Sequence, residues 1–148
     1  MRISIAALVC ALALLANSTV PFPAGYRTWT VTRSLVAKDG PNAGFHHYYA
    51  NPQALEGFTS GKFHDGSVIV DERLEVDQNG GGSFEGKRIS IAVMRKDSGR
   101  YSETGGWGFD AAAGDSQVLA APADMRAMCY ACHAKQKDRD FVFSTFRK

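Results

Sequence analysis

Residues 67–76 read Ser-Val-Ile-Val-Asp-Glu-Arg-Leu-Glu-Val, in which apolar and polar side chains alternate over most of the length. Successive side chains of a strand point to opposite faces, so this pattern predicts a strand with one apolar and one mainly polar face. The residues expected on the two faces are Val68, Val70, Leu74 and Val76 on the first, and Ile69, Asp71, Arg73 and Glu75 on the second. A glycine-rich loop at 79–83 and a second strand at 88–94 follow, which predicts an antiparallel hairpin.

Further elements are expected on both sides of this hairpin. Strand-like segments rich in aromatic and β-branched residues occur at 26–32, 45–50, 107–109 and 141–146. The first of them could instead begin with a helical turn. Asn51 before Pro52 predicts the start of a short helix, and good helix formers at 123–137 predict a longer one. Together these elements predict an α+β fold, an antiparallel β-sheet with a few packed helices.

Composition narrows the class of protein. The chain has 148 residues, 45% of them hydrophobic and 22% charged, and its formal net charge is +2. This length fits a single domain, and these values are ordinary for a globular protein rather than a disordered or multi-span membrane protein. A nearly neutral chain lacks the basic surface that nucleic-acid binding requires, so no nucleic-acid partner is expected.

The N-terminus has the pattern of an export signal. Arg2 precedes an almost unbroken apolar run at 3–15, and Ala16-Asn17-Ser18 then places small residues at the two positions that a signal peptidase reads. The run is shorter than the ~20 residues that span a bilayer, so we expect cleavage near Ser18 and no membrane anchor afterwards. The expected organisation is a signal peptide at 1–18 and one domain at 19–148, exported to the periplasm.

Both cysteines of that expected mature domain lie in the sequence Cys129-Tyr130-Ala131-Cys132-His133. Cys-x-x-Cys-His is the attachment motif of a c-type haem, in which both thiols bond the porphyrin and the histidine is the axial ligand of the iron. The motif predicts covalently attached haem c held by Cys129 and Cys132, with His133 as the iron ligand, on a C-terminal helix. A thioredoxin-like redox pair and part of a zinc site are the competing interpretations.

The second axial position of the expected haem is predicted to be open. No methionine or histidine follows His133, and Met125 and Met128 precede the motif on its own helix. Met94 could reach the iron, but a methionine on a strand is more often core packing. A five-coordinate iron, or one with water as sixth ligand, favours binding of a small molecule over simple electron transfer.

Several further stretches, together with this motif, resemble the cytochrome P460 family. They are Tyr26-Arg27-x-Trp29, Asn51-Pro52, Gly61-Lys62-Phe63-x-Asp65-Gly66-Ser67-Val68-Ile69-Val70, Met94-x-Lys96-Asp97, Gly106-Trp107-Gly108-Phe109 and Asp140-Phe141-Val142-Phe143. The resemblance implies a β-rich, usually homodimeric fold and two functional types. One type oxidises hydroxylamine and carries a lysine cross-linked to the haem. The other, cytochrome c′-beta, binds nitric oxide or carbon monoxide at an apolar, phenylalanine-capped haem face.

Two positions of this chain depart from the hydroxylamine-oxidising type. Asp71 stands where the resemblance places the cross-linking lysine, and Ala92 stands where it places a proton-relaying carboxylate. We therefore expect a mono-haem cytochrome that binds nitric oxide, with carbon monoxide or hydroxylamine as other possible ligands. Hydroxylamine oxidation and electron transfer to a partner cytochrome remain the alternatives. Asp71 is the candidate distal base, and it could equally belong to a solvated strand face.

The remaining candidates concern the surroundings of the haem. Phe45 is the candidate cap of the distal pocket, with an aromatic core residue as the alternative, and Ala92 is expected to line the pocket. Adjacent His46 and His47 should point to opposite faces of a strand. One of them could enter the pocket, but a surface or ordinary hydrogen-bonding role is the expectation for both. We expect Lys62, Lys87 and Lys96 to be surface residues, and Trp29 and Trp107 to serve core and dimer packing.

Overall fold

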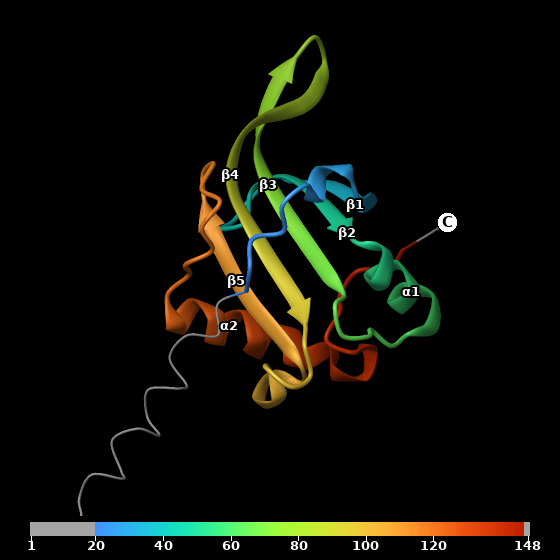
Figure 1. Ribbon diagram of the computed structural model, residues 1–148. Helices are drawn as coiled ribbons and strands as arrows, with labels where there is room; N and C mark the ends of the chain where they lie inside the picture. Colours follow the sequence, from blue (N-terminus) through green and yellow to red (C-terminus); the bar gives the residue numbers. More distant parts are fainter. Residues whose placement is uncertain (1–19, 147–148) are drawn as a thin grey trace, which may run out of the picture.

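A single five-stranded antiparallel sheet forms the centre of the computed structural model, which describes residues 20–146 (Figure 1). Its strands follow one another in chain order and are β1 (Thr30–Ala37), β2 (Gly44–Ala50), β3 (Val68–Asn79), β4 (Gly82–Lys96) and β5 (Trp107–Ala113). The predicted hairpin is therefore β3–β4, and its far end projects beyond the rest of the sheet (Figure 1). The expected signal peptide at 1–18 lies outside the described residues.

Helices join and cover the strands. They are α1 (Pro52–Ser60), α2 (Ala123–His133) and the 3₁₀ turns η2 (Tyr26–Thr28), η3 (Ser102–Thr104) and η4 (Ala134–Arg139). Asn51 caps α1 as expected, because its side chain accepts a hydrogen bond from the backbone N–H of Ala54. The α+β class predicted from the sequence is thus confirmed. Among the described residues, no helix is both long and apolar enough to cross a membrane.

Three element boundaries differ from the sequence-based expectations. The segment at 26–32 begins with η2, and only its second part belongs to a strand. The helix expected at 123–137 ends at His133 and continues as η4. Residues 141–146 form no strand, because Asp140 (φ 49°) and Phe141 (φ 66°) have left-handed backbone that turns the chain out of an extended path.

The alternation of β3 separates two apolar cores, whereas the sequence pattern predicted one apolar and one mainly polar face. Val68 and Val70 pack on one face with Tyr26 and Tyr49. On the opposite face a second core contains Ile69, and its other buried members are Ala50, Ala54, Phe63, Met94, Trp107, Phe109, Phe141 and Val142. α2 and the segment after η4 lie on this second face, where Tyr130 and Ala134 contact the core. The functional motif is therefore placed on the Ile69 face of the sheet.

Candidate functional site

The C-terminal end of α2 presents the two thiols and the imidazole of the motif. Cys129 is half-buried, Cys132 is exposed, and both are free thiols. Residues three and four apart lie on one face of a helix, so Cys132 and His133 both lie beside Cys129. None of the residues of α2 is buried, although the helix lies against the sheet. Its side chains are therefore accessible to a further group at this face.

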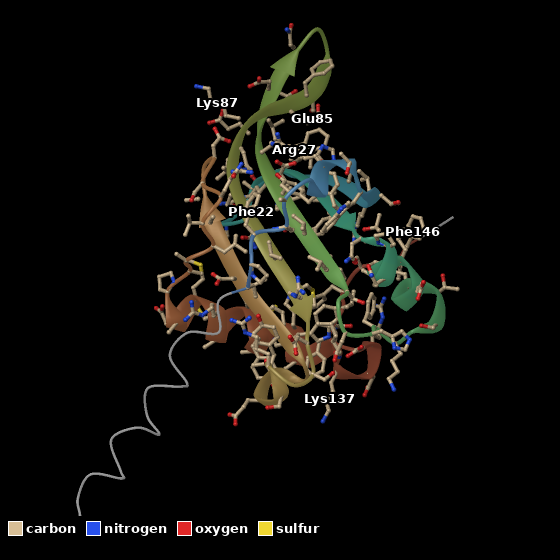
Figure 2. All side chains as sticks on the ribbon, in the orientation of Figure 1. Phe22, Arg27, Glu85, Lys87, Lys137 and Phe146 are labelled. Carbon is tan, nitrogen blue, oxygen red and sulfur yellow. The ribbon has the colours of Figure 1, made fainter. Side chains whose placement is uncertain are left out.

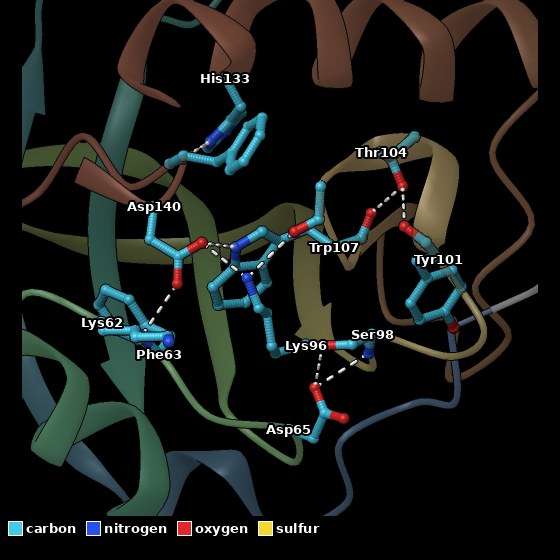
Figure 3. A network of polar contacts seen from close by, with 12 residues as sticks. Lys62, Phe63, Asp65, Lys96, Ser98, Tyr101, Thr104, Trp107, His133 and Asp140 are labelled. Atoms are coloured by element: carbon cyan, nitrogen blue, oxygen red, sulfur yellow. Dashed lines mark hydrogen bonds and ion pairs between the residues drawn. The ribbon is translucent and has the colours of Figure 1, made fainter. Parts of the chain in front are cut away.

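His133 is held in one orientation by the segment that follows η4. Its Nδ1 lies 2.7 Å from the backbone oxygen of Phe141, which can only accept, so Nδ1 carries the proton (Figure 3). The rings of Phe109 and Phe143 each lie 5.0 Å from the imidazole. Burial lowers the pKa of His133, which favours the neutral ring. Neutral imidazole with Nδ1 bonded to a carbonyl leaves Nε2 free to bind a metal, the usual arrangement of a histidine ligand.

Two neighbouring cavities have residues of the motif and of the sheet in their walls. The smaller, of about 330 Å³, is lined by Cys129, Cys132 and His133. The larger, of about 850 Å³, continues along the sheet. Both have Asn42, Asp71, Ala92 and Cys129 in their walls. These volumes lie in the ~300–1,000 Å³ range of small-molecule and cofactor sites.

Small side chains form the sheet wall of the cavities. Asp71 of β3, Ala92 of β4 and Ala111 of β5 are aligned neighbours across the three strands. Ala92 is exposed although β4 lies between two other strands. This arrangement brings Asp71 and Ala92, both singled out from the sequence, to the same space as the Cys-x-x-Cys-His motif. The alanine surface, the open thiols and the oriented imidazole therefore line one space.

Asp71 is hydrogen-bonded to His46. His46 is buried, and its Nδ1 lies 2.8 Å from Oδ1 of Asp71. Its Nε2 lies 2.8 Å from the backbone oxygen of Asn42, which can only accept, so Nε2 is protonated. A hydrogen bond at Nδ1 then requires one more proton, located either on the imidazole or on the carboxyl group. Burial raises the pKa of Asp71, whereas His46 opposes this effect.

This pair was only partly foreseen from the sequence. Asp71 was a candidate base, and the structure places it in the cavity wall rather than on a solvated face. His46 was expected to have a surface or ordinary hydrogen-bonding role. The alternation of β2 does send His46 and His47 to opposite faces, and it is His46 that joins Asp71. The pairing of β2 with β3 aligns His46 with Arg73, and it aligns Tyr48, two residues further along β2, with Asp71. This register could not be predicted from the sequence.

Phe45 lies away from both cavities. It is aligned with Leu74 of β3, and its ring lies tilted, 4.9 Å from the ring of His47, on the opposite face of the sheet from Asp71. This placement differs from the expectation that Phe45 caps the site, because β2 alternates and His46 takes the cavity face. The aromatic side chains that do line the smaller cavity are Tyr48, Phe109 and Phe143. Burial, together with the charge of Asp71, raises the pKa of Tyr48 to about 12.

The three lysines of interest are outside the cavity walls. Lys62 and Lys87 are exposed, and Lys87 lies toward the projecting end of the β3–β4 hairpin (Figure 2). Lys96, expected on the surface, is buried, and its Nζ lies 2.6 Å from Oδ1 of Asp140. No lysine lines either cavity within residues 20–146. Trp107 is fully buried in the second core, as expected, and Trp29 packs partly against the first.

The competing interpretations of the two cysteines gain no support. A thioredoxin-like pair needs a thiol of low pKa at a helix N-terminus. Here the pair lies at the C-terminal end of α2, and burial raises the pKa of Cys129. In the part of the chain that the structure describes, no three His, Cys, Asp or Glu side chains are grouped to hold a metal ion, as a zinc site would require.

Comparison with known families agrees with the motifs. The family model described as Cytochrome P460 matches residues 23–144, which is most of the chain and includes all residues of the site. No curated protein matches the sequence.

Proposed function

The chain belongs to the cytochrome P460 family, which implies a haem cofactor, and from this premise we propose that it is a c-type cytochrome that binds nitric oxide at an open side of its haem iron. The observation that carries the proposal is the oriented His133 beside two free thiols, facing a cavity with Asp71 and Ala92 in its wall. Covalent attachment and the identity of the ligand are parts of this proposal.

The residues of the site fit a covalently bound haem. Cys129 and Cys132 would form the two thioether bonds, and Nε2 of His133 would bind the iron. When bound, the haem supplies an iron with one coordination position for a small ligand. The protein contributes an alanine-lined wall, an imidazole of defined tautomer and aromatic side chains that exclude water. An uncharged diatomic ligand needs no charged pocket and no proton transfer, so these residues suffice for it.

The alternative of hydroxylamine oxidation is disfavoured by two side chains. A carboxylate at Asp71 cannot form the cross-link that the family resemblance places at this position, and no lysine in the described residues lines the cavities. Ala92, at the expected position of the relay carboxylate, has no group that can transfer a proton. Both features support ligand binding over oxidation.

Covalent attachment is tested on protein matured with the haem-attachment machinery. Intact mass and a pyridine haemochrome assay should detect one haem per chain, and Cys129→Ser or Cys132→Ser should leave one thioether at most. Peptide mapping should find the haem on the Cys129–His133 segment alone. A mass equal to the bare chain would overturn the haem assignment. A second haem-bearing peptide that contains Lys62, Lys87 or Lys96 would revive the oxidase interpretation.

Nitric oxide binding is tested on the reduced protein by optical titration and stopped-flow kinetics. We expect saturable binding of one nitric oxide per haem and little turnover of hydroxylamine with an artificial electron acceptor. Rapid hydroxylamine turnover by the wild type, or a reduced iron that binds no diatomic ligand, would contradict the proposed function.

Hydroxylamine oxidation remains the second candidate because of one observation, the 2.8 Å contact between Nδ1 of His46 and Oδ1 of Asp71 in the wall of the larger cavity. Oxidation of hydroxylamine releases protons as electrons leave, and a carboxylate or a neutral imidazole at this position is a group that can accept one. If Asp71 serves as this base, Asp71→Asn should abolish turnover while haem incorporation is unchanged. This outcome would reverse our ranking of the two functions.

Export and assembly complete the proposal. We infer export to the periplasm from the N-terminal sequence, since haem c is attached outside the bacterial cytoplasm.

A homodimer and a partner cytochrome for electrons follow from the family resemblance. β1 offers an edge for self-association, because it is a mostly exposed edge strand with apolar Val31 and Val36 at its surface. Light scattering of the purified protein measures the dimer directly.

A further inference from the structure

The segment that orients His133 has an unfavourable backbone conformation. Asp140 (φ 49°) and Phe141 (φ 66°) are the two residues other than glycine with positive φ between residues 20 and 146. Side chains with a Cβ rarely adopt this region, and two in succession persist only where the surrounding structure holds them. The backbone oxygen that accepts from Nδ1 of His133 belongs to the second of these residues.

The carboxylate of Asp140 holds this segment through three contacts. Its Oδ1 lies 2.6 Å from Nζ of Lys96 and accepts a 3.3 Å hydrogen bond from Nε1 of Trp107. Its Oδ2 accepts a 2.9 Å bond from the backbone N–H of Phe63 (Figure 3). These donors come from β4, β5 and the loop after α1, so one side chain attaches the turn to three separate parts of the fold.

Lys96 makes further contacts around the carboxylate of Asp140. It is buried, and its Nζ also donates a 3.1 Å hydrogen bond to the backbone oxygen of Gly105 and lies 5.1 Å from the ring centre of Trp107. The ring of Phe141 packs on Gly105 so closely that a Cβ there would lie 2.2 Å from it. The ion pair and this ring contact together fix both residues of the left-handed turn.

We propose that Lys96 and Asp140 are positioning residues for His133, which act through the backbone oxygen of Phe141 to set the strength of the axial bond to iron. The inference rests on the proposed function, because it requires that His133 binds a haem iron. A firmly held carbonyl 2.7 Å from Nδ1 makes the imidazole a stronger donor at Nε2. A stronger axial donor stabilises the oxidised iron and lowers the reduction potential.

A purely structural role of the ion pair would affect stability and leave the properties of the iron unchanged. The test therefore measures the iron–histidine bond and the reduction potential. In the haem-loaded protein, Asp140→Asn and Lys96→Gln should lower the iron–histidine stretching frequency of the reduced form. Mutation of a residue that hydrogen-bonds a metal ligand changes metal affinity or activity about 10-fold or more. We therefore expect the reduction equilibrium to shift about 10-fold toward the reduced form, which is about 59 mV for a one-electron couple.

Asp65→Asn is the matched control. Asp65 also accepts two hydrogen bonds in this region, from N and Oγ of Ser98 at 2.9 and 2.7 Å, and neither bond involves Asp140 or Lys96 (Figure 3). The Asp65→Asn variant should leave both the reduction potential and the iron–histidine stretching frequency at wild-type values. If single variants fail to fold, the double variant Lys96→Gln/Asp140→Asn leaves no charge unpaired and serves instead.

The outcomes separate this inference from the proposed function. Wild-type protein that incorporates no haem contradicts the proposed function itself. Folded variants that carry haem and have the wild-type potential and stretching frequency overturn the positioning role, while the proposed function stands. A shift of equal size in Asp65→Asn would also overturn it, because the effect would then be general to the region.

Discussion

Replacement of Glu72 by glutamine should destabilise the fold strongly, because this carboxylate is the acceptor at the centre of the first core. It is 1% exposed on β3. Its Oε1 accepts a 2.6 Å hydrogen bond from the hydroxyl of Tyr26 and forms an ion pair with the guanidinium of Arg27. Its Oε2 accepts from the hydroxyl of Tyr49 at 3.2 Å. These contacts attach η2 and β2 to the middle of the sheet.

The expected loss follows from what glutamine cannot do. Its NH₂ group replaces one acceptor, so one buried donor loses its partner at a cost of about 1–3 kcal/mol. The bond from Arg27 loses its charge assistance, but this side chain is 58% exposed, so solvent screening limits that contribution to at most about 1 kcal/mol. Together these losses lower the free energy of unfolding by about 3 kcal/mol. At ~2–4 °C per kcal/mol for a domain of this size, the melting temperature should fall by about 10 °C.

The same carboxylate predicts a pH dependence. Burial raises the pKa of Glu72, but the hydrogen bonds from Arg27 and Tyr26 outweigh it, and the pKa lies below its ordinary value. A carboxyl group with a depressed folded-state pKa adds stability that is present above its unfolded pKa of about 4.3 and is lost as pH falls toward the folded value. The wild type should therefore lose stability below about pH 4.3, and Glu72→Gln should lack this part of the loss.

Urea unfolding followed by circular dichroism, at pH 7 and at a series of lower pH values, measures both effects. Glu75→Gln is the control, because Glu75 is exposed on the same strand and should unfold like the wild type. If Glu72→Gln and Glu75→Gln have the same free energy of unfolding at pH 7, then the buried carboxylate does not hold η2 to the sheet and the reasoning fails.

Three further predictions concern the site and α1. Asp71→Asn should leave the nitric oxide affinity of the reduced protein nearly unchanged, and a large loss in stopped-flow measurements would contradict an apolar binding mode. Gly57→Ala places a Cβ 2.2 Å from the ring of Phe63, so thermal unfolding should show a loss of about 1–3 kcal/mol from overpacking. Asn51→Ala removes the cap of α1 and the acceptor for the N–H of Val68, and should cost about 2 kcal/mol in urea unfolding; a neutral effect would refute the capping role.

Local patterns were sufficient for most of the elements and for the Cys-x-x-Cys-His motif. The alternation in β3, the glycines of the following turn and the Asn51-Pro52 start of α1 each depend on residues that are neighbours in the chain. The same holds for Cys129, Cys132 and His133, whose spacing on a helix brings them together without help from the rest of the fold. These features could therefore be predicted from the amino-acid sequence alone.

The environment of that motif was decided by the tertiary structure. Phe45 and His46 belong to a strand without a clear apolar alternation, so only its pairing with β3 shows which of them faces the cavity. His46 and Asp71, and likewise Lys96 and Asp140, are far apart in sequence and meet only through strand register and loop packing. The left-handed turn at Asp140 and Phe141 is opposed by local preference and exists because the assembled fold holds it. The sequence by itself thus determined which residues are candidates for the chemistry, and long-range packing determined what surrounds and orients them.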